Sequence, residues 1–433
     1  MCTLNHTYQN DIKDNSKFTL RMFVAVISAM VFASNALAND LVTERRKDQF
    51  PTSSGYLIAP VPYSMPGLGK GFFMLGHFTN AFSTTGDLTV LKATGDIDGY
   101  DVNIDEVPIV DHHLFLRAEL LDLSAAQQNY YDTRGMNTKK NDYSLMDISS
   151  FKQQNLGLDL TFYERRLTFS LDRSISKGEL SAVRNSDGDI ITEFSDPYKF
   201  DNNETRLTMQ LDLTDDYQDP RSGIRANLRY QDRPAKSDND PDYYVTELDV
   251  SLYKPLFKSD TLVFNLFQSD AHVTKKGNIN RDDIAAELGF NCAPTDTQCK
   301  DTESSVIDNF VNERAHGTAT SLGGLNRLRA YPGERFNGAH TATIGMEYRM
   351  NFEHEATPFN YSIWKDTQTG IQVAFFAEVG TVAETMDELW KETRSVVGSG
   401  VRLVTGSGAV YRFDLAVGDE GVQPNLFFYY PWK

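Results

Sequence analysis

Cysteine is almost absent from this chain of 433 residues, which contains only three. Cys2 precedes the segment that we interpret below as an export signal, and Cys292 and Cys299 lie in the polar stretch NCAPTDTQC. In an oxidising compartment these two thiols can close a small loop as a disulfide. Two thiols without a neighbouring histidine do not supply the four ligands of a structural zinc site. We therefore expect no metal site and no cofactor.

Long apolar runs are also missing. Beyond residue 38 no segment approaches the ~20 consecutive apolar residues that a membrane-spanning helix needs. The one apolar run, residues 22–33, follows Lys17 and Arg21 and precedes Ala36-Leu37-Ala38. This order is typical of a signal peptide over residues 1–38, cleaved near Ala38. The alternative, an N-terminal anchor helix, fits less well because the run is too short to span a bilayer.

Positive charge is scarce, because 42 Lys and Arg residues face 60 Asp and Glu residues, for a net charge of −18. This balance excludes nucleic acid as a partner, since phosphate binding needs a basic face. No G-x-S-x-G nucleophile elbow occurs, which argues against a fused lipase-type hydrolase. Asp111-His112-His113 has no visible catalytic partner, and we interpret it as a solvated cluster where a strand begins. We expect no enzymatic activity.

Alternation of apolar and polar residues is the strongest positive signal. In residues 341–352, Ile344 and Met346 belong to one face of a strand, whereas Glu347 and Arg349 belong to the other. A soluble β-sandwich also shows this period, but here one face is apolar and aromatic for most of its length and the other carries charges. That contrast is typical of a transmembrane β-barrel with lipid outside and a wet lumen inside. The same period recurs in residues 156–162, 167–171, 207–213, 224–230, 248–252, 262–266, 370–380 and 409–417.

The spacing of these segments predicts an all-β, transmembrane antiparallel β-barrel of sixteen strands over residues 71–433. Nine strands precede residue 273, among them three weaker ones near 71–81, 86–95 and 112–122. Five follow residue 340, and we place two more in residues 304–321. Residues 39–70 are then a short periplasmic segment. Long polar connections at 123–151, 176–202 and 274–310 are expected as external loops, with short periplasmic turns between them. Residues 96–111 form a longer connection than this scheme requires.

The most specific motif of the chain is a glycine pair followed by an arginine and an aromatic residue. It reads Gly323-Gly324-Leu325-Asn326-Arg327-Leu328-Arg329-Ala330-Tyr331. This segment resembles the bacterial surface antigen family, the superfamily of BamA- and TamA-type outer-membrane assembly factors and of two-partner secretion transporters. In that family a GG…(V/L)RG(F/Y) motif lies in the sixth external loop, which folds back into the barrel lumen. The resemblance extends to residues 214–230, 394–403 and 415–432.

The resemblance implies that Arg329 reaches acidic residues on the inner wall of the barrel. Glu347 in MEYRMNF and Glu378 in FFAEVGTV match the family's positions, and both lie on the polar face of their strands by alternation. A guanidinium can bridge two carboxylates with forked hydrogen bonds, which lysine cannot do. The alternative is that each charge faces lumen water. Ala330 departs from the motif, which has glycine there, and alanine is strained if that backbone needs φ > 0.

The resemblance also implies a function, which is the insertion or translocation of protein or lipid at the outer membrane of a Gram-negative bacterium. Family members that receive unfolded clients carry periplasmic POTRA domains, and residues 39–70 are too few for one, so the chain reads as a POTRA-less member. The alternative is a narrow or gated diffusion channel; a hydrolase ranks far below both. The expected partners are outer-membrane lipid and lipopolysaccharide, with a client outer-membrane or secreted protein, around a monomeric barrel.

Overall fold

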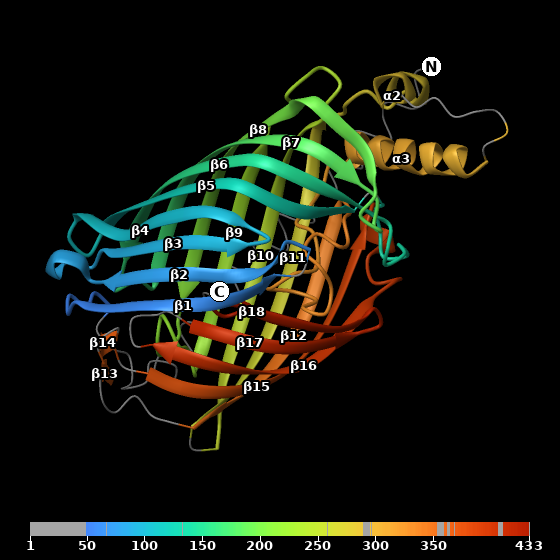
Figure 1. The fold of residues 1–433 in the computed structure, drawn as a ribbon. Coiled ribbons are helices and arrows are strands. Elements are labelled where there is room, and N and C mark those ends of the chain that lie inside the picture. The colour runs from blue at the N-terminus through green and yellow to red at the C-terminus, as the bar shows by residue number, and fades with distance from the viewer. Residues whose placement is uncertain are drawn as a thin grey trace.

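The computed structural model describes residues 49–432 apart from residues 66, 132, 258, 289–294, 296, 353–358, 362–363, 368 and 406–409. The predicted signal peptide lies outside the described residues. Cys292 and the side chain of Cys299 lie outside them as well, so the disulfide stays a prediction. Within this range the chain winds into one closed antiparallel β-barrel (Figure 1).

Sixteen strands form the wall, each antiparallel to its neighbours, and a short hairpin lies between two of them. The wall strands are β1 (Gly55–Met65), β2 (Gly69–Thr79), β3 (Asp87–Gly95), β4 (Asp98–Val110), β5 (Leu114–Tyr131), β6 (Tyr143–Phe162), β7 (Leu167–Arg184), β8 (Ile190–Asp212), β9 (Gly223–Arg233), β10 (Asp242–Leu256), β11 (Asp260–Lys275), β12 (His340–Asn351), β15 (Thr369–Ala383), β16 (Arg394–Thr405), β17 (Val410–Gly418) and β18 (Gly421–Phe428). The hairpin consists of β13 (Phe359–Tyr361) and β14 (Trp364–Thr367).

Consecutive wall strands pair in order around the barrel, with β12 pairing directly with β15. Closure occurs where the first strand meets the last. There β1 and β18 share one pair among the described residues, Ser64 with Leu426, whereas β1 shares eleven pairs with β2. At its other end β1 pairs with β14, at Tyr56 and Leu57. We call the β1–β18 contact the seam.

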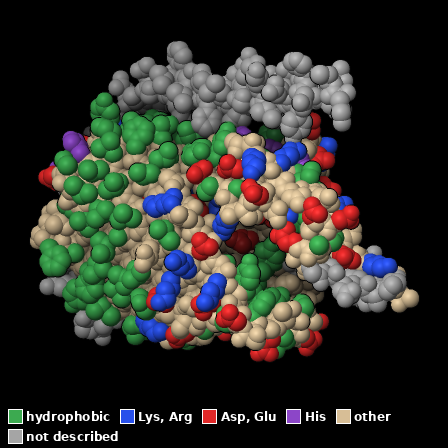
Figure 2. Space-filling model, turned by 90° about the horizontal axis from the view of Figure 1, so that it is seen from above, with side chains coloured by type: hydrophobic (Ala, Val, Ile, Leu, Met, Phe, Trp, Pro, Cys, Tyr) green, Lys and Arg blue, Asp and Glu red, His purple; other side chains and the backbone are tan. Residues whose placement is uncertain are grey.

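The two faces of the wall differ as the alternation predicts. In β12, Ile344 and Met346 are 46% and 43% exposed, whereas Glu347 and Arg349 are 0% and 1% exposed. An apolar outer face suits lipid, and a polar inner face suits a lumen. Figure 2 shows hydrophobic side chains spread over one half of the viewed face, while charged side chains gather over the other half. The predicted fold class is confirmed.

The count of sixteen strands was right, but the positions of two strands were wrong. Residues 304–321 do not form strands, because helix α3 (Thr297–His316) covers most of them and a loop follows. The two missing strands are β1, which lies inside the expected periplasmic segment 39–70, and β4, which fills the expected connection 96–111. The barrel therefore begins at residue 55. β1 was not predicted as a strand because it contains Pro60 and Pro62, and proline is rare inside sheets although it is tolerated at their edges.

Two of the expected external loops are mostly strand. β5 and β6 pair as far as Tyr131 and Tyr143, and β7 and β8 pair as far as Arg184 and Ile190, so residues 123–151 and 176–202 are largely extended hairpins. Their sequence looks polar because beyond the bilayer no lipid requires an apolar face. The connection 276–339 carries α2 (Arg281–Leu288) and α3, which lie beyond this end of the barrel (Figure 1).

We name the two ends of the barrel for the text below. The loop rim carries the connections 132–142 and 276–339, and the turn rim carries the short connections 80–86, 111–113, 163–166 and 213–222. Two 3₁₀ turns, Ala81–Ser83 and Met386–Glu388, complete the regular elements. Among the described residues, no α-helix has the length and apolar character needed to cross a bilayer.

Candidate functional site: the arginine core of the lumen loop

The connection between α3 and β12 turns back into the barrel. We call residues 317–339 the lumen loop. Leu322 and Phe336 exchange backbone hydrogen bonds of 2.9 and 3.0 Å, so the loop is a folded hairpin whose tip holds the glycine–arginine motif. The hairpin packs its apolar side chains against the inner wall in a cluster of buried residues that comprises Met136, Leu322, Leu328, Ala330, Tyr331, Phe336, Phe376, Val382, Val396 and Ala416.

The glycine pair shapes the tip of the hairpin. Gly323 and Gly324 have φ angles of 109° and 94°, which residues with a side chain rarely adopt. A Cβ atom on Gly323 would lie 2.0 Å from the carbonyl oxygen of Pro332, so the chain cannot pass here with any larger residue. Leu328 is also left-handed, with φ 49°. This bend turns Arg329 toward the wall formed by β12, β15, β16 and β17.

Arg329 is fully buried and contacts three carboxylates. Its Nε donates to Glu378 of β15 at 2.8 Å, and its backbone N–H donates to the same carboxylate at 3.0 Å. Its Nη1 donates to Asp414 of β17 at 2.8 Å and to Glu347 of β12 at 3.3 Å. The guanidinium also lies 3.4 Å from the ring centroid of Phe376, a cation–π distance. One side chain thus joins the loop to three strands.

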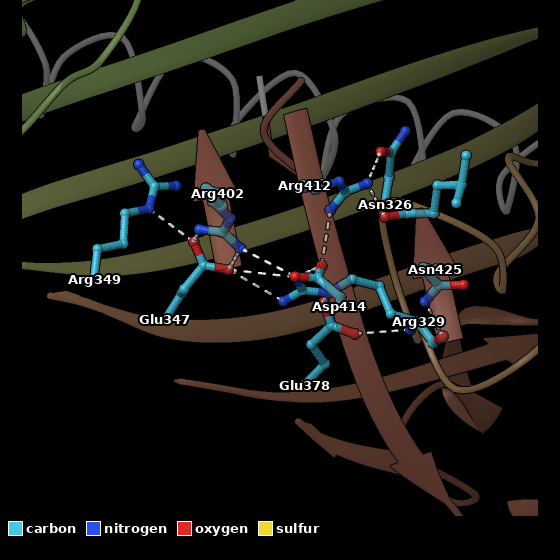
Figure 3. Close-up of polar contacts among 10 residues, drawn as sticks. Asn326, Arg329, Glu347, Arg349, Glu378, Arg402, Arg412, Asp414 and Asn425 are labelled. Carbon is cyan, nitrogen blue, oxygen red and sulfur yellow. Dashed lines mark hydrogen bonds and ion pairs between the residues drawn. The ribbon is translucent and has the colours of Figure 1, made fainter. Parts of the chain in front are cut away.

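Further arginines on the wall surround these carboxylates (Figure 3). Glu347 accepts a hydrogen bond from Nη2 of Arg402 at 2.6 Å and one from Nε of Arg349 at 2.7 Å. Asp414 accepts from Nη1 of Arg412 at 3.3 Å. Charge-assisted bonds of this kind are about twice as strong as neutral ones. We call the seven residues Arg329, Glu347, Arg349, Glu378, Arg402, Arg412 and Asp414 the arginine core.

The arginine core holds four cations and three anions, and Tyr430 and Asp219 extend its network toward the turn rim. The Arg349 guanidinium lies 3.9 Å from the ring centroid of Tyr430. The Tyr430 hydroxyl donates to Asp219 at 2.6 Å. Asp219 belongs to the β8–β9 turn, so a buried carboxylate from the turn rim extends the network. Buried charges need such pairing, because each one loses its hydration.

Ala330 adopts no strained conformation, contrary to the concern raised by the missing motif glycine. Its φ is not among the positive values of the described residues. The methyl group has room because residue 418 of β17 is glycine. A Cβ atom on Gly418 would lie 3.0 Å from the Ala330 Cβ. The pair Ala330 and Gly418 therefore preserves the close approach between loop and wall.

Contacts outside the core also fix the hairpin to the wall and the rim. Arg335 is fully buried and binds Glu420 of the β17–β18 turn at 2.7 Å. Arg327 binds Asp249 of β10 at 2.5 Å, and the Tyr331 hydroxyl donates to Asp419. The hairpin is thus tied to consecutive wall strands from β10 to the β17–β18 turn.

Comparison with known proteins assigns this arrangement to a family. The model of the Omp85 superfamily domain matches residues 117–425. The chain belongs to the Omp85 superfamily. The resemblance that the glycine–arginine motif indicated is therefore confirmed, and this span contains the lumen loop and every residue of the arginine core. A search of curated protein sequences finds no match.

Several solved structures resemble this Omp85 barrel at low sequence identity. BamA from Haemophilus ducreyi lacking POTRA domains 1–3 shares 12% identity at a TM-score of 0.47, covering 93% of this chain and 77% of that one. CdiB from Escherichia coli shares 10% sequence identity at a TM-score of 0.47, and the match covers 87% of this chain and 61% of that one. CdiB from Acinetobacter baumannii shares 11% sequence identity at a TM-score of 0.45, and the match covers 87% of this chain and 58% of that one. This chain spans about three fifths of the two CdiB chains.

The Omp85 hairpin borders a cavity at the loop rim. Its volume is about 710 Å³, and it lies between the hairpin, α3 and the inner wall of β8–β10. Arg206, Arg229 and Arg233 line it, together with Glu313 of α3 and Glu334 of the hairpin. Burial raises the pKa of both carboxyls, although nearby arginines oppose the shift. The cavity is a polar vestibule that ends at the hairpin.

Sequence reasoning found part of this site. The structure places Arg329 between Glu378 and Glu347, the two partners that the motif suggested. The sequence prediction did not include Asp414, which lies as close to Arg329 as Glu378 does. The sequence prediction also did not include Arg402 and Arg412 as members of the arginine core. Alternation had already put Arg412 and Asp414 on the inner face, so the signal existed, but period two alone does not say which inward residues meet across strands.

Proposed function

We propose that this Omp85 barrel inserts or translocates a polypeptide or lipid at the outer membrane through its seam, not through an open lumen. The observation that carries the proposal is that, within the part of the chain that the structure describes, one residue pair, Ser64 with Leu426, joins β1 to β18. The neighbouring ladder between β17 and β18 has eight pairs. A sheet in lipid must satisfy its backbone groups, so a weakly paired seam is the place where a client strand can add.

Prolines on both seam strands support this reading. β1 contains Pro60 and Pro62, and β18 contains Pro424. Each proline lacks a backbone N–H and so removes one donor from a ladder. An unpaired strand edge is a template for another strand. The sequence of the two seam strands thus disfavours a fully hydrogen-bonded closure.

The hairpin in the lumen also supports a route through the seam. The hairpin is tied to β12, β15 and β17 by buried ion pairs and to β10 by a partly exposed one. A solute that entered the vestibule would meet this hairpin. We place the loop rim outside the cell, because barrels of this class carry their longer connections there. The clients then approach from the turn rim.

A disulfide across the seam tests the proposal. Ser64→Cys with Leu426→Cys, in a background with Cys292→Ser and Cys299→Ser, joins paired residues whose separation suits a disulfide. The assay is the rate at which a urea-unfolded outer-membrane β-barrel becomes protease-resistant in liposomes that contain this protein. We expect the oxidised variant to fall to the rate of empty liposomes, and reductant to restore it.

The matched control locks a ladder that is already closed. Val397→Cys with Val417→Cys joins β16 to β17 at a paired position on the lipid-facing side. We expect this variant to insert the client at the unmodified rate, oxidised or reduced. An oxidised seam variant that works as fast as this control contradicts a role for the seam.

The alternative function is a narrow or gated diffusion channel. Its supporting observation is the vestibule of about 710 Å³ at the loop rim. A channel requires that the hairpin leave the lumen, whereas seam activity requires that it stay. Single-channel recording of the unmodified barrel and of Arg329→Ala separates the two functions.

A further inference from the structure

The turn rim carries a second cluster of buried contacts that the seam mechanism above does not use. It surrounds residues 49–54, which precede β1 and which we call the strap. The strap contacts three turns in succession. Asn80 of the β2–β3 turn donates through Nδ2 to the carbonyl of Ser53 at 2.8 Å, and the Ser54 hydroxyl donates to the carbonyl of Asn80 at 2.7 Å. Further along, Phe50 reaches the β4–β5 and β6–β7 turns.

Phe50 is the anchor of the strap. Its ring stacks on His112 with centroids 4.4 Å apart and planes 6° apart, and on Phe115 at 5.7 Å. The Arg165 guanidinium lies 4.7 Å from its centroid. Stacked aromatic rings and a cation over a ring face are both attractive arrangements. The His112 side chain is 57% exposed, as the sequence suggested, and it stacks on the outer side of Phe50.

Arg165 holds the pocket together. It is 5% exposed and binds Glu106 through two parallel hydrogen bonds of 2.7 and 2.6 Å. Its Nε donates to the carbonyl of Gln49 at 2.8 Å. It also lies 5.4 Å from the ring centroid of Tyr217 in the β8–β9 turn. One guanidinium therefore connects the strap to the β6–β7 and β8–β9 turns.

The backbone around this pocket is unusual. Five non-glycine residues adopt left-handed φ angles between 53° and 63°, namely Glu106, His112, Tyr163, Glu164 and Arg165. Such conformations are uncommon outside glycine. They persist where surrounding contacts hold them, and they gather at ligand clamps and switch regions. Their concentration at one rim distinguishes this pocket from ordinary turns.

We propose that the strap is an internal latch that fixes the base of β1, and that the pocket around Arg165 is its catch. β1 is the seam strand, and its pair with β18 lies at the opposite end, at Ser64. At its base β1 is held by the β2 ladder, by β14 at Tyr56 and Leu57, and by the strap. Release of Phe50 frees the base of β1 and allows the seam to widen from the turn rim. This consequence rests on the proposed function; the latch itself does not.

Hydrogen–deuterium exchange on the folded, reconstituted barrel tests the latch without any client. In Phe50→Ala, amides of residues 56–59 are expected to exchange at least tenfold faster, while β12 and β15–β17 keep their rates. Arg165→Lys retains the charge but loses the two parallel bonds to Glu106. It is expected to act in the same direction, so a failure of one variant to fold leaves the other as the test.

Phe257→Ala is the matched control. Phe257 is an aromatic residue of the same rim, in the β10–β11 turn, with a left-handed φ of 52° and 87% exposure. We expect it to leave β1 exchange unchanged. Unchanged β1 exchange in Phe50→Ala and Arg165→Lys overturns the latch, and so does an equal increase in every strand. Because no client is present, this failure is distinct from a failure of the seam disulfide test.

Discussion

Replacing Arg329 with alanine is expected to lower the free energy of unfolding of the barrel by about 3–5 kcal/mol, the usual cost of breaking a buried ion pair. The reason is the environment left behind. Glu378 and Asp414 lose the guanidinium that lies 2.8 Å from each of them, and both are buried. The readout is the temperature at which the folded band disappears in gel electrophoresis, together with the urea midpoint in lipid.

Two control variants separate the arginine core from general loss of contact. Arg329→Lys keeps the charge but cannot reach three carboxylates with one planar group, so we expect most of the loss to remain. Arg327→Ala removes a neighbouring arginine of the same hairpin, which is partly exposed and binds only Asp249 among carboxylates. We expect it to cost about 1 kcal/mol. Equal effects of Arg329→Ala and Arg327→Ala would refute the special role of Arg329.

The second large effect is expected from Glu347, the carboxylate shared by Arg329, Arg349 and Arg402. Glu347→Gln retains the shape of the side chain but leaves an excess of buried positive charge. We expect it to lower the free energy of unfolding by about 3–5 kcal/mol. Glu378→Gln removes a partner of Arg329 alone, and Asp414 still pairs with that arginine. We expect about 1–3 kcal/mol there.

The order of these two variants is the critical result, and the same gel and urea measurements report it. Glu378 is the nearer of the two carboxylates to Arg329, so a model based on that one pair gives the opposite order. Glu378→Gln being the more destabilising variant would show that Glu347 is not the centre of the network. An unchanged band temperature in both variants would refute the ion-pair account of the hairpin altogether.

The barrel wall could be predicted from sequence because lipid and lumen impose opposite demands on successive residues. That pressure is strong in β12 and β15, where the alternation is uninterrupted, and both strands were placed correctly. It is weak in β1, where Pro60 and Pro62 break the pattern. It is absent in residues 123–131, where β5 continues beyond the apolar belt. Errors therefore lie where prolines break the pattern or where both faces of a strand meet water.

The arginine core was predictable only as far as a motif named its members. Arg329, Glu347 and Glu378 stand in recognisable segments, whereas Asp414 is one of several inward acidic residues. Its meeting with Arg329 depends on the register between β16 and β17, which pairs Gly400 with Asp414. Register of this kind follows from the closed wall as a whole.

The strap illustrates contacts that no local pattern reveals. Phe50 and Arg165 are separated by more than a hundred positions along the chain, yet they meet at one rim. His112 is exposed, as its polar neighbours Asp111 and His113 suggested, but its stacking on Phe50 could not be predicted. Only the folded barrel brings the β2–β3, β4–β5 and β6–β7 turns together. Sequence could name these residues but could not assemble them.

We propose that the hairpin held by Arg329 blocks the lumen and that insertion or translocation of the client occurs at the seam. Single-channel recording in planar bilayers tests it most directly. We predict little steady current from the unmodified barrel, and frequent large openings from Arg329→Ala, because the hairpin then leaves the lumen. Large, stable currents from the unmodified barrel that do not change in Arg329→Ala would contradict the claim and favour a diffusion channel.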